Sequence, residues 1–267
     1  MSEFDVGALV VHWRNRPSRH GNLKAQSIRK YIGILNKFLT WTGNPVVSQM
    51  VEQGKLLVPR APDPDVKILG EDALLRLLHT AEGMSGWEGS VARLLVAVLP
   101  NCGLRREEIR LARLIDVDTR DWTLYVVHPK GERAWGKERL APILPAARQA
   151  ILDYLDERRI YLRGQLHEAL IPLRRFDGTV SYWSDGLFAK LKGRLEWESG
   201  VRFHLRTFRS TFAPVAKDHN VSIEAVSRAL GHRTTRTTEI YYGRIRTESA
   251  LAEFEQAFAV REVHFSK

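Results

Sequence analysis

Five cationic or imidazole side chains and one phenol recur along the second part of the chain and could together cleave a phosphodiester. They are Arg105, Lys130, Arg206, Arg209, His232 and Tyr241. A tyrosine that cuts DNA attacks phosphorus in line, and the transition state carries extra negative charge that fixed guanidinium groups can stabilise. Taken singly, arginines usually lie on solvated faces and tyrosines usually pack. The set therefore predicts such a site only through its joint order and spacing.

Other common chemistries have no counterpart in the sequence. No P-loop, HExxH, GxSxG or paired-carboxylate motif occurs. The single cysteine, Cys102, excludes an intramolecular disulfide and a CxxC metal cluster, which favours a reducing compartment. The sequence shows no signal peptide and no run of roughly 18 apolar residues, so we expect a cytoplasmic protein without a membrane partner. The net charge of +10 favours a polyanionic partner.

The elements that must position these residues fall into two predicted domains. Residues 59–64 read PRAPDP, and three prolines in six positions block a helix and favour an extended connector. We expect a small helical domain over residues 1–60, a proline-rich linker over 61–68 and a larger domain over 69–267. The small domain has nine Lys and Arg against three Asp and Glu, so it holds six of the ten net positive charges.

One helix of the small domain is expected to be amphipathic and basic. Apolar residues recur at helical spacing at Ile28, Tyr31, Leu35 and Phe38. Three basic residues fall between them on other faces: Arg29, Lys30 and Lys37. The pattern leaves two interpretations open, an ordinary solvated helix and a DNA-contacting surface.

The larger domain reads as mainly α with a small antiparallel β-sheet, an α+β fold. Helices are expected over residues 70–83, 91–99 (ending near Pro100) and 105–115. Two β-rich segments, 121–129 and 137–144, flank a basic, Gly-containing tip and predict a hairpin. From Ala146 onward the pattern is helical again. The expected N-caps and stop are Ser184 or Asp185, Ser222, and Gly231.

Three motifs in this order resemble the tyrosine recombinases of the phage integrase family. Gly-Leu-Arg ends at Arg105 and is followed three residues later by Glu108. A second arginine, Arg209, precedes the histidine of Leu-Gly-His, His232, by 23 positions. Tyr241 follows nine residues later, and a lysine of the predicted hairpin lies between the first two motifs. The spacing is similar to that of Xer-type enzymes.

The resemblance implies a fold, a reaction and partners. It implies that a core-binding domain and a catalytic domain form a C-shaped clamp on double-stranded DNA, which would make the protein nucleoid-associated. It implies cleavage and rejoining through a covalent 3′-phosphotyrosine at Tyr241, strand exchange through a Holliday junction, and no metal or nucleotide cofactor. Four protomers would assemble on DNA. In solution, without DNA, the protein could still be a monomer. A simple Xer-like system is expected, because no separate arm-binding segment precedes the small domain.

The resemblance also implies a role for each matching residue. Arg105 and Arg209 would bind the scissile phosphate, Glu108 would orient the region of the first arginine, and His232 would donate a hydrogen bond to a phosphate oxygen. Lys130 on the hairpin would protonate the 5′-oxygen leaving group.

Two of these assignments have an alternative at a nearby position. Lys137 is the alternative to Lys130, since the tip of the hairpin is long. Tyr242 is the alternative to Tyr241, which the nine-residue interval favours.

One position departs from the family pattern. Where the family has His-x-x-Arg, this chain reads Arg-Thr-Phe-Arg, with Arg206 in place of the histidine. An arginine can donate to a phosphate but cannot act as a neutral base at pH 7. His204 is a potential substitute, and Ser210 stands where a second histidine is common. The variation is similar to that of archaeal integrases and predicts a divergent branch.

Residues 247–258 read as an amphipathic helix with Leu251, Phe254 and Phe258 at helical spacing. It would either close its own core or dock on a neighbouring protomer. Two alternatives to the recombinase also remain: a recombinase-derived DNA-binding protein with weakened catalysis, and a type IB topoisomerase.

Overall fold

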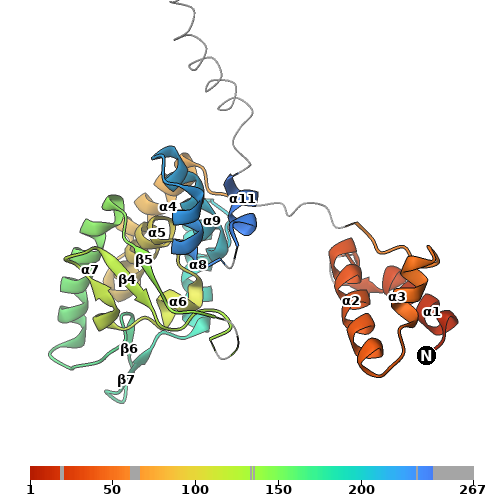
Figure 1. Cartoon of the computed structure of the whole chain (residues 1–267). Coiled ribbons are helices and arrows are strands. Elements are labelled where there is room, and N and C mark those ends of the chain that lie inside the picture. Colours follow the sequence, from red (N-terminus) through yellow and green to blue (C-terminus); the bar gives the residue numbers. More distant parts are fainter. Residues whose placement is uncertain (19–20, 61–66, 133, 135, 233, 243–267) are drawn as a thin grey trace, which may run out of the picture. The chain divides into compact units, whose positions relative to one another are not determined.

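Helices make up most of the chain in the computed structural model. The structure describes residues 1–18, 21–60, 67–132, 134, 136–232 and 234–242, and only the backbone of residues 17, 18, 21 and 240–242. The chain divides into two units, Met1–Asp65 and Val66–Lys267 (Figure 1). The predicted tail helix, residues 247–258, and most of the predicted linker lie outside the described residues.

The first unit is a small helical bundle with a short β-ribbon. Its elements are α1 (Glu3–Asn15), β1 (Pro17–Ser18), β2 (Gly21–Asn22), α2 (Ala25–Trp41) and α3 (Val46–Glu52). Ser2 caps α1, because its side chain accepts a hydrogen bond from the Asp5 backbone N–H. The three helices bury a common core of Val6, Val10, Ile28, Ile32, Leu39, Val46, Val47, Met50 and Leu56.

The buried face of α2 differs from the predicted one at Phe38. This side chain is 58% exposed and pairs with Trp41, their ring centroids 6.3 Å apart. The buried positions are Ile28, Ile32 and Leu39. These residues recur at multiples of the helical turn and form one stripe, which the neighbouring helices contact. Position 38 lies beside this stripe and therefore stays outside the core.

The second unit combines eight α-helices with two small antiparallel sheets among its described residues (Figure 1). Its helices are α4 (Glu71–Gly83), α5 (Gly86–Cys102), α6 (Arg106–Arg110), the 3₁₀ turn η1 (Leu114–Asp116), α7 (Pro145–Leu162), α8 (Asp185–Ser199), α9 (Leu205–Asp218), α10 (Ile223–Leu230) and α11 (Thr235–Tyr242). One sheet has the order β3 (Val117–Asp118), β4 (Thr123–Val126), β5 (Arg139–Pro142), and the other pairs β6 (Pro172–Arg174) with β7 (Val180–Tyr182).

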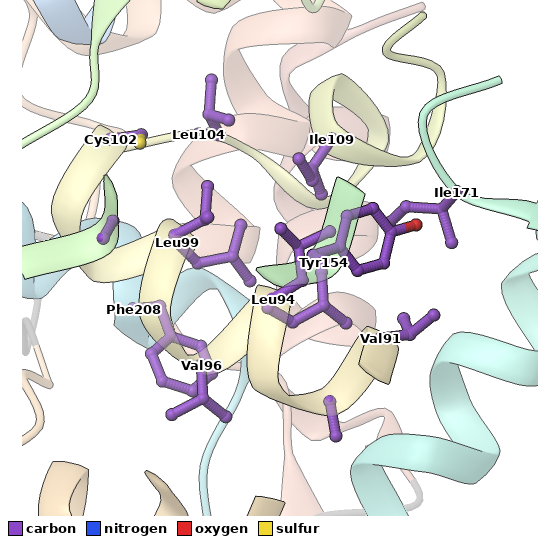
Figure 2. Close-up of a cluster of buried hydrophobic side chains, with 14 of the residues drawn as sticks. Val91, Leu94, Val96, Leu99, Cys102, Leu104, Ile109, Tyr154, Ile171 and Phe208 are labelled. Carbon is purple, nitrogen blue, oxygen red and sulfur yellow. The ribbon is translucent and has the colours of Figure 1, made fainter. Parts of the chain in front are cut away.

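Helix α5 is the centre of this unit. It contacts α4, α7, α8 and α9, and it is buried nearly all round, as expected of a helix that is apolar on every side. Figure 2 shows its side chains Val91, Leu94 and Leu99 packed among residues from other elements, including Tyr154 of α7 and Phe208 of α9. This core fixes the ends of α5 and α9, from which the arginines of the predicted site extend.

The mainly α fold with small antiparallel sheets is confirmed, and so is the hairpin. Strands β4 and β5 pair antiparallel, with Leu124 opposite Ala141. The side chain of Ser184 caps α8 and that of Ser222 caps α10, each accepting a backbone N–H at 3.3 Å. Among the described residues no helix is both long and apolar enough to cross a membrane.

Three predicted helix boundaries in this unit are wrong. Helix α5 begins at Gly86, five residues before the predicted start at Val91. Helix α5 continues through Pro100 to Cys102, because a proline in the last turn removes only one backbone hydrogen bond before the helix stops. The helix expected over 105–115 ends at Arg110. Beyond it the backbone pairs with a distant segment, since the Leu170 N–H donates to the Ala112 carbonyl oxygen at 2.8 Å.

The hairpin of β6 and β7 was not predicted. Each strand has only three residues, which is too short for an alternating pattern to stand out from the helical segments around it. Strand β3, which has only two residues, was not predicted for the same reason.

Candidate active site

Two glycines in the left-handed conformation turn the chain at the predicted site. Helix α5 ends at Gly103, with φ 63°, and α10 ends at Gly231, with φ 64°. A side chain would be strained in this conformation. A Cβ on Gly103 would also lie 2.7 Å from Leu230 Cδ2, and one on Gly231 would lie 2.9 Å from Arg139 Cδ. Both motifs, Gly-Leu-Arg and Leu-Gly-His, therefore need glycine for its backbone and for its size.

Arg209 in α9 links the two turns. It is 8% exposed. Its Nη1 donates to the Gly103 carbonyl oxygen at 2.5 Å, and its Nη2 donates to the Leu230 carbonyl oxygen. Because the guanidinium is held in place by the backbone, it needs little reorganisation to stabilise negative charge nearby.

Glu108 is a buried carboxylate that accepts hydrogen bonds from two arginines. Nη1 of Arg105 donates to Oε1 at 2.6 Å, and the Arg105 backbone N–H donates to Oε2 at 2.8 Å. Arg139 in β5 donates to both oxygens, at 3.0 and 2.7 Å. Burial by itself would raise the pKa of Glu108, but the hydrogen bonds and charges of Arg139 and Arg105 outweigh it and lower the pKa to about 2. The carboxylate is therefore charged at neutral pH.

His232 has partners at both ring nitrogens. Nδ1 lies 2.8 Å from Thr238 Oγ1, and Nε2 lies 3.3 Å from Arg209 Nη2. Because a guanidinium can only donate, Nε2 accepts and Nδ1 carries the proton. Burial lowers the pKa of His232 to about 4, and the charges of Arg209 and Arg105 contribute to the shift. The ring is therefore neutral at pH 7.

A cavity of about 620 Å³, hereafter the arginine cavity, opens where these elements meet. Its lining includes five of the predicted catalytic residues, Arg105, Lys130, Arg206, Arg209 and His232. They come from the N-cap of α6, the β4–β5 loop, α9 and the turn after α10. Several fixed cations around one opening can hold a phosphate diester and stabilise added charge on its oxygens.

The alternatives that the sequence left open lie in different places. Lys130 lines the arginine cavity, whereas Lys137 lines a neighbouring cavity of about 540 Å³, which Lys130 also borders. His204 is the N-cap of α9 and is not among the residues that line the arginine cavity. Ser210 does line it, and its hydroxyl donates to the Arg206 carbonyl oxygen at 3.2 Å.

Helix α11 carries the predicted nucleophile and begins beside the arginine cavity. Thr237 lines the cavity, and Thr238 is fully buried against His232. Tyr241 lies four positions after Thr237, one helical turn further on. The side chains of Tyr241 and Tyr242 lie outside the described residues, and the choice of Tyr241 stays a prediction.

Four residues of the site were not predicted as functional: Arg139, Thr238, His128 and Glu132. A signal for Arg139 exists in the hairpin itself. It stands two residues before Ala141, which is fully buried, and alternate residues of a strand share a face. Alternation along β5 could therefore have placed an arginine on the inner face, which implies a buried acidic partner.

The three basic residues predicted to bind DNA are all exposed on α2. Arg29, Lys30 and Lys37 lie on the outside of the first unit. Their exposure fits both a solvated surface and a phosphate-binding surface, so the DNA-binding role stays a prediction.

Comparison with known proteins identifies the class. Residues 67–247 match the model of the phage integrase family, which covers more than half of the chain, and the chain belongs to this family of tyrosine recombinases and integrases. The family predicted from the three motifs is confirmed.

Individual relatives are similar at a moderate level. The tyrosine recombinase XerD of Caulobacter vibrioides is 29% identical over 189 residues, 70% of this chain and 60% of XerD. The tyrosine recombinase XerA of Saccharolobus solfataricus is 25% identical over 218 residues, 82% of this chain and 63% of XerA. This chain thus spans less than two thirds of either relative.

A solved structure shows the same fold. In a post-cleavage complex of the XerH site-specific recombinase with a palindromic difH substrate, the XerH chain matches with a TM-score of 0.67 at 17% identity, over 98% of this chain and 73% of that one.

Proposed function

We propose that this protein is a site-specific DNA recombinase that cleaves and rejoins strands through a covalent 3′-phosphotyrosine at Tyr241. The observation that carries the proposal is the arginine cavity, in which Arg105, Arg209 and Lys130 meet beside the helix that bears the tyrosine. Membership of the phage integrase family supports the same reaction.

The cations have separate tasks in the proposed step. Arg105 and Arg209 contact the nonbridging oxygens of the scissile phosphate, where negative charge develops. Both are already held in place, Arg105 by Glu108 and Arg209 by backbone carbonyls. Arg206 is a third guanidinium in the cavity and supplies charge where the family has histidine. His232 donates to the phosphate from Nε2, once this nitrogen has released Arg209 and carries the ring proton in place of Nδ1.

Cleavage breaks one bond and forms another of similar energy. The Tyr241 oxygen bonds to phosphorus as the bond from phosphorus to the 5′-oxygen breaks, and Lys130 gives the 5′-oxygen its proton. Rejoining is the reverse reaction with a new 5′-hydroxyl. Two rounds of exchange, one strand pair at a time, pass through a Holliday junction. The chain's own residues supply every group in this scheme.

Duplex DNA is the proposed partner of both units. Arg29, Lys30 and Lys37 of α2 contact backbone phosphates. Exchange between two sites requires four protomers on DNA, and the tail segment 247–258 docks on a neighbouring copy. Such a protein works at the nucleoid.

The experiment is covalent trapping. Fragmented total DNA of the organism that encodes the protein is incubated with the full chain in EDTA, the reaction is stopped with detergent, and the DNA attached to protein is sequenced. We expect one enriched sequence, joined through its 3′ end, that is lost in Tyr241→Phe and kept in Tyr242→Phe. DNA binding without any adduct would instead indicate a binding protein, and relaxation of any supercoiled plasmid would indicate a topoisomerase.

A further inference from the structure

We propose that His128 is the proton acceptor for the nucleophilic tyrosine, an inference that rests on the proposed function. A phenol has a pKa of about 10, so a general base must take its proton as the oxygen attacks phosphorus. The base must be able to accept at neutral pH and must lie at the arginine cavity.

The other titratable groups of the cavity are poor acceptors. Arg206 stays protonated in a protein. Glu108 is bound by two arginines, which hold its pKa at about 2. The Glu107 carboxylate is paired with two further arginines. Its Oε1 lies 2.8 Å from Arg106 Nη2, and its Oε2 lies 2.7 Å from Arg110 Nη2. The Nε2 of His232 already accepts from Arg209, and the pKa of this ring is about 4.

His128 is the second imidazole of the cavity and differs from His232 in its partner. Its Nδ1 lies 3.1 Å from Glu132 Oε2 and 3.2 Å from Oε1. A carboxylate at Nδ1 favours the tautomer that carries the proton there, which leaves the Nε2 lone pair to accept. Among the residues that the structure describes, Nε2 has no hydrogen-bond partner.

The local fold holds this pair at the cavity. His128 comes two residues after β4, and the Glu132 N–H donates to the Pro129 carbonyl oxygen at 3.1 Å, which closes a turn. Pro129 is buried and anchors the turn. His128, Pro129, Lys130 and Glu132 all line the arginine cavity. One loop thus carries both the proton acceptor and, two residues later, the proton donor to the leaving group.

The Tyr241 hydroxyl proton passes to His128 Nε2 as the phenolic oxygen bonds to phosphorus. The bond from phosphorus to the 5′-oxygen breaks, and that oxygen takes a proton from Lys130. Glu132 stabilises the imidazolium that results. Religation moves both protons back.

The test compares His128→Asn with wild type in single-turnover cleavage of a nicked duplex of the trapped sequence. Asparagine keeps a donor toward Glu132 and removes the ring nitrogen that accepts. We expect adduct formation to slow by about 10²- to 10⁴-fold, with DNA affinity and melting temperature unchanged. His219→Asn, an exposed histidine at the end of α9, is the matched control and should cleave at the wild-type rate.

A substrate with sulfur in place of the bridging 5′-oxygen separates the base from the acid. A thiolate leaves without protonation, because a thiol has a pKa of about 8.5. Lys130→Ala should regain cleavage on this substrate, whereas His128→Asn should remain slow.

Two results would overturn the inference while the proposed function stands: wild-type cleavage by His128→Asn, or its rescue by the sulfur substrate. Absence of any wild-type adduct would overturn the proposed function, and the inference with it.

Discussion

At the scale of single residues, the site depends on a buried negative charge. The Glu108 side chain is 1% exposed and is bound by Arg105 and Arg139, with Arg209 3.7 Å away. Its negative charge offsets the repulsion between these three guanidinium groups. We therefore expect the carboxylate to act by positioning the arginines.

Glu108→Gln tests this role. The amide keeps the shape but leaves buried arginines without their counter-charge, so we expect the free energy of unfolding of the second unit to fall by about 3 kcal/mol. Urea denaturation measures it. The matched control is Glu107→Gln, whose carboxylate is 42% exposed and should change stability by no more than about 0.5 kcal/mol. Equal effects of the two substitutions would contradict the role of Glu108.

His232 makes stability depend on pH in a defined direction. Its pKa falls from 6.5 to about 4 on folding, so the unfolded chain binds the extra proton in this range. Stability is fully present above pH 6.5 and is lost as pH falls toward 4. Denaturation curves at pH 7 and pH 5 should differ by roughly 1 to 2 kcal/mol in wild type, and the difference should shrink in His232→Asn. The depressed pKa of Glu108 adds its own loss only below about 4.5.

At the scale of elements, two helix ends converge on one guanidinium. The carbonyl oxygens at the ends of α5 and α10 both accept from Arg209. Each end depends on a left-handed glycine, so the turns and the arginine form one structural unit.

Substitution of Gly231 tests the role of the second turn. Gly231→Ala introduces both the strained backbone and a contact with the Arg139 side chain, and we expect a loss of about 3 kcal/mol with weaker cleavage. Gly200→Ala is the matched control, since Gly200 also has positive φ, 69°, but a Cβ added there would have no atom within 4 Å. The control should lose about 1 kcal/mol and cleave normally. Equal losses would show that the contact with Arg139 does not matter.

The sequence predicted those elements whose signals are local. Cap residues, glycine stops and the two β-rich segments around the Gly-containing tip are signals carried by neighbouring residues, and they placed α8, α10 and the β4–β5 hairpin. The end of α6 at Arg110 could not be predicted, because it is set by backbone pairing with residues almost 60 positions away. The grouping of Arg105, Arg206, Arg209 and His232 was predicted from motif order, whereas Arg139 and the His128–Glu132 pair needed the folded structure.

At the scale of the whole molecule, charge is divided unevenly between the two units. The first unit carries four of the ten net positive charges on about a quarter of the residues, and α2 exposes three of its cations. A basic surface of this kind binds DNA phosphates independently of the base sequence. Its contribution to DNA affinity falls as the salt concentration rises.

A triple substitution measures that contribution. Changing Arg29, Lys30 and Lys37 to alanine should weaken binding to all duplexes alike and lower the slope of log affinity against log salt by about 0.9 for each phosphate that the variant no longer binds. Lys55→Ala is the control, because Lys55 is paired with Glu3 at 2.9 Å and should contribute little. An unchanged salt slope in the triple variant would show that α2 faces away from DNA.

The most direct test of the central claim is the chemical identity of the link between protein and DNA. After trapping, digestion with nuclease and trypsin and mass spectrometry of the peptides should find a nucleotide joined through its 3′-phosphate to Tyr241. A link to another residue, or through a 5′-phosphate, would contradict the proposed mechanism.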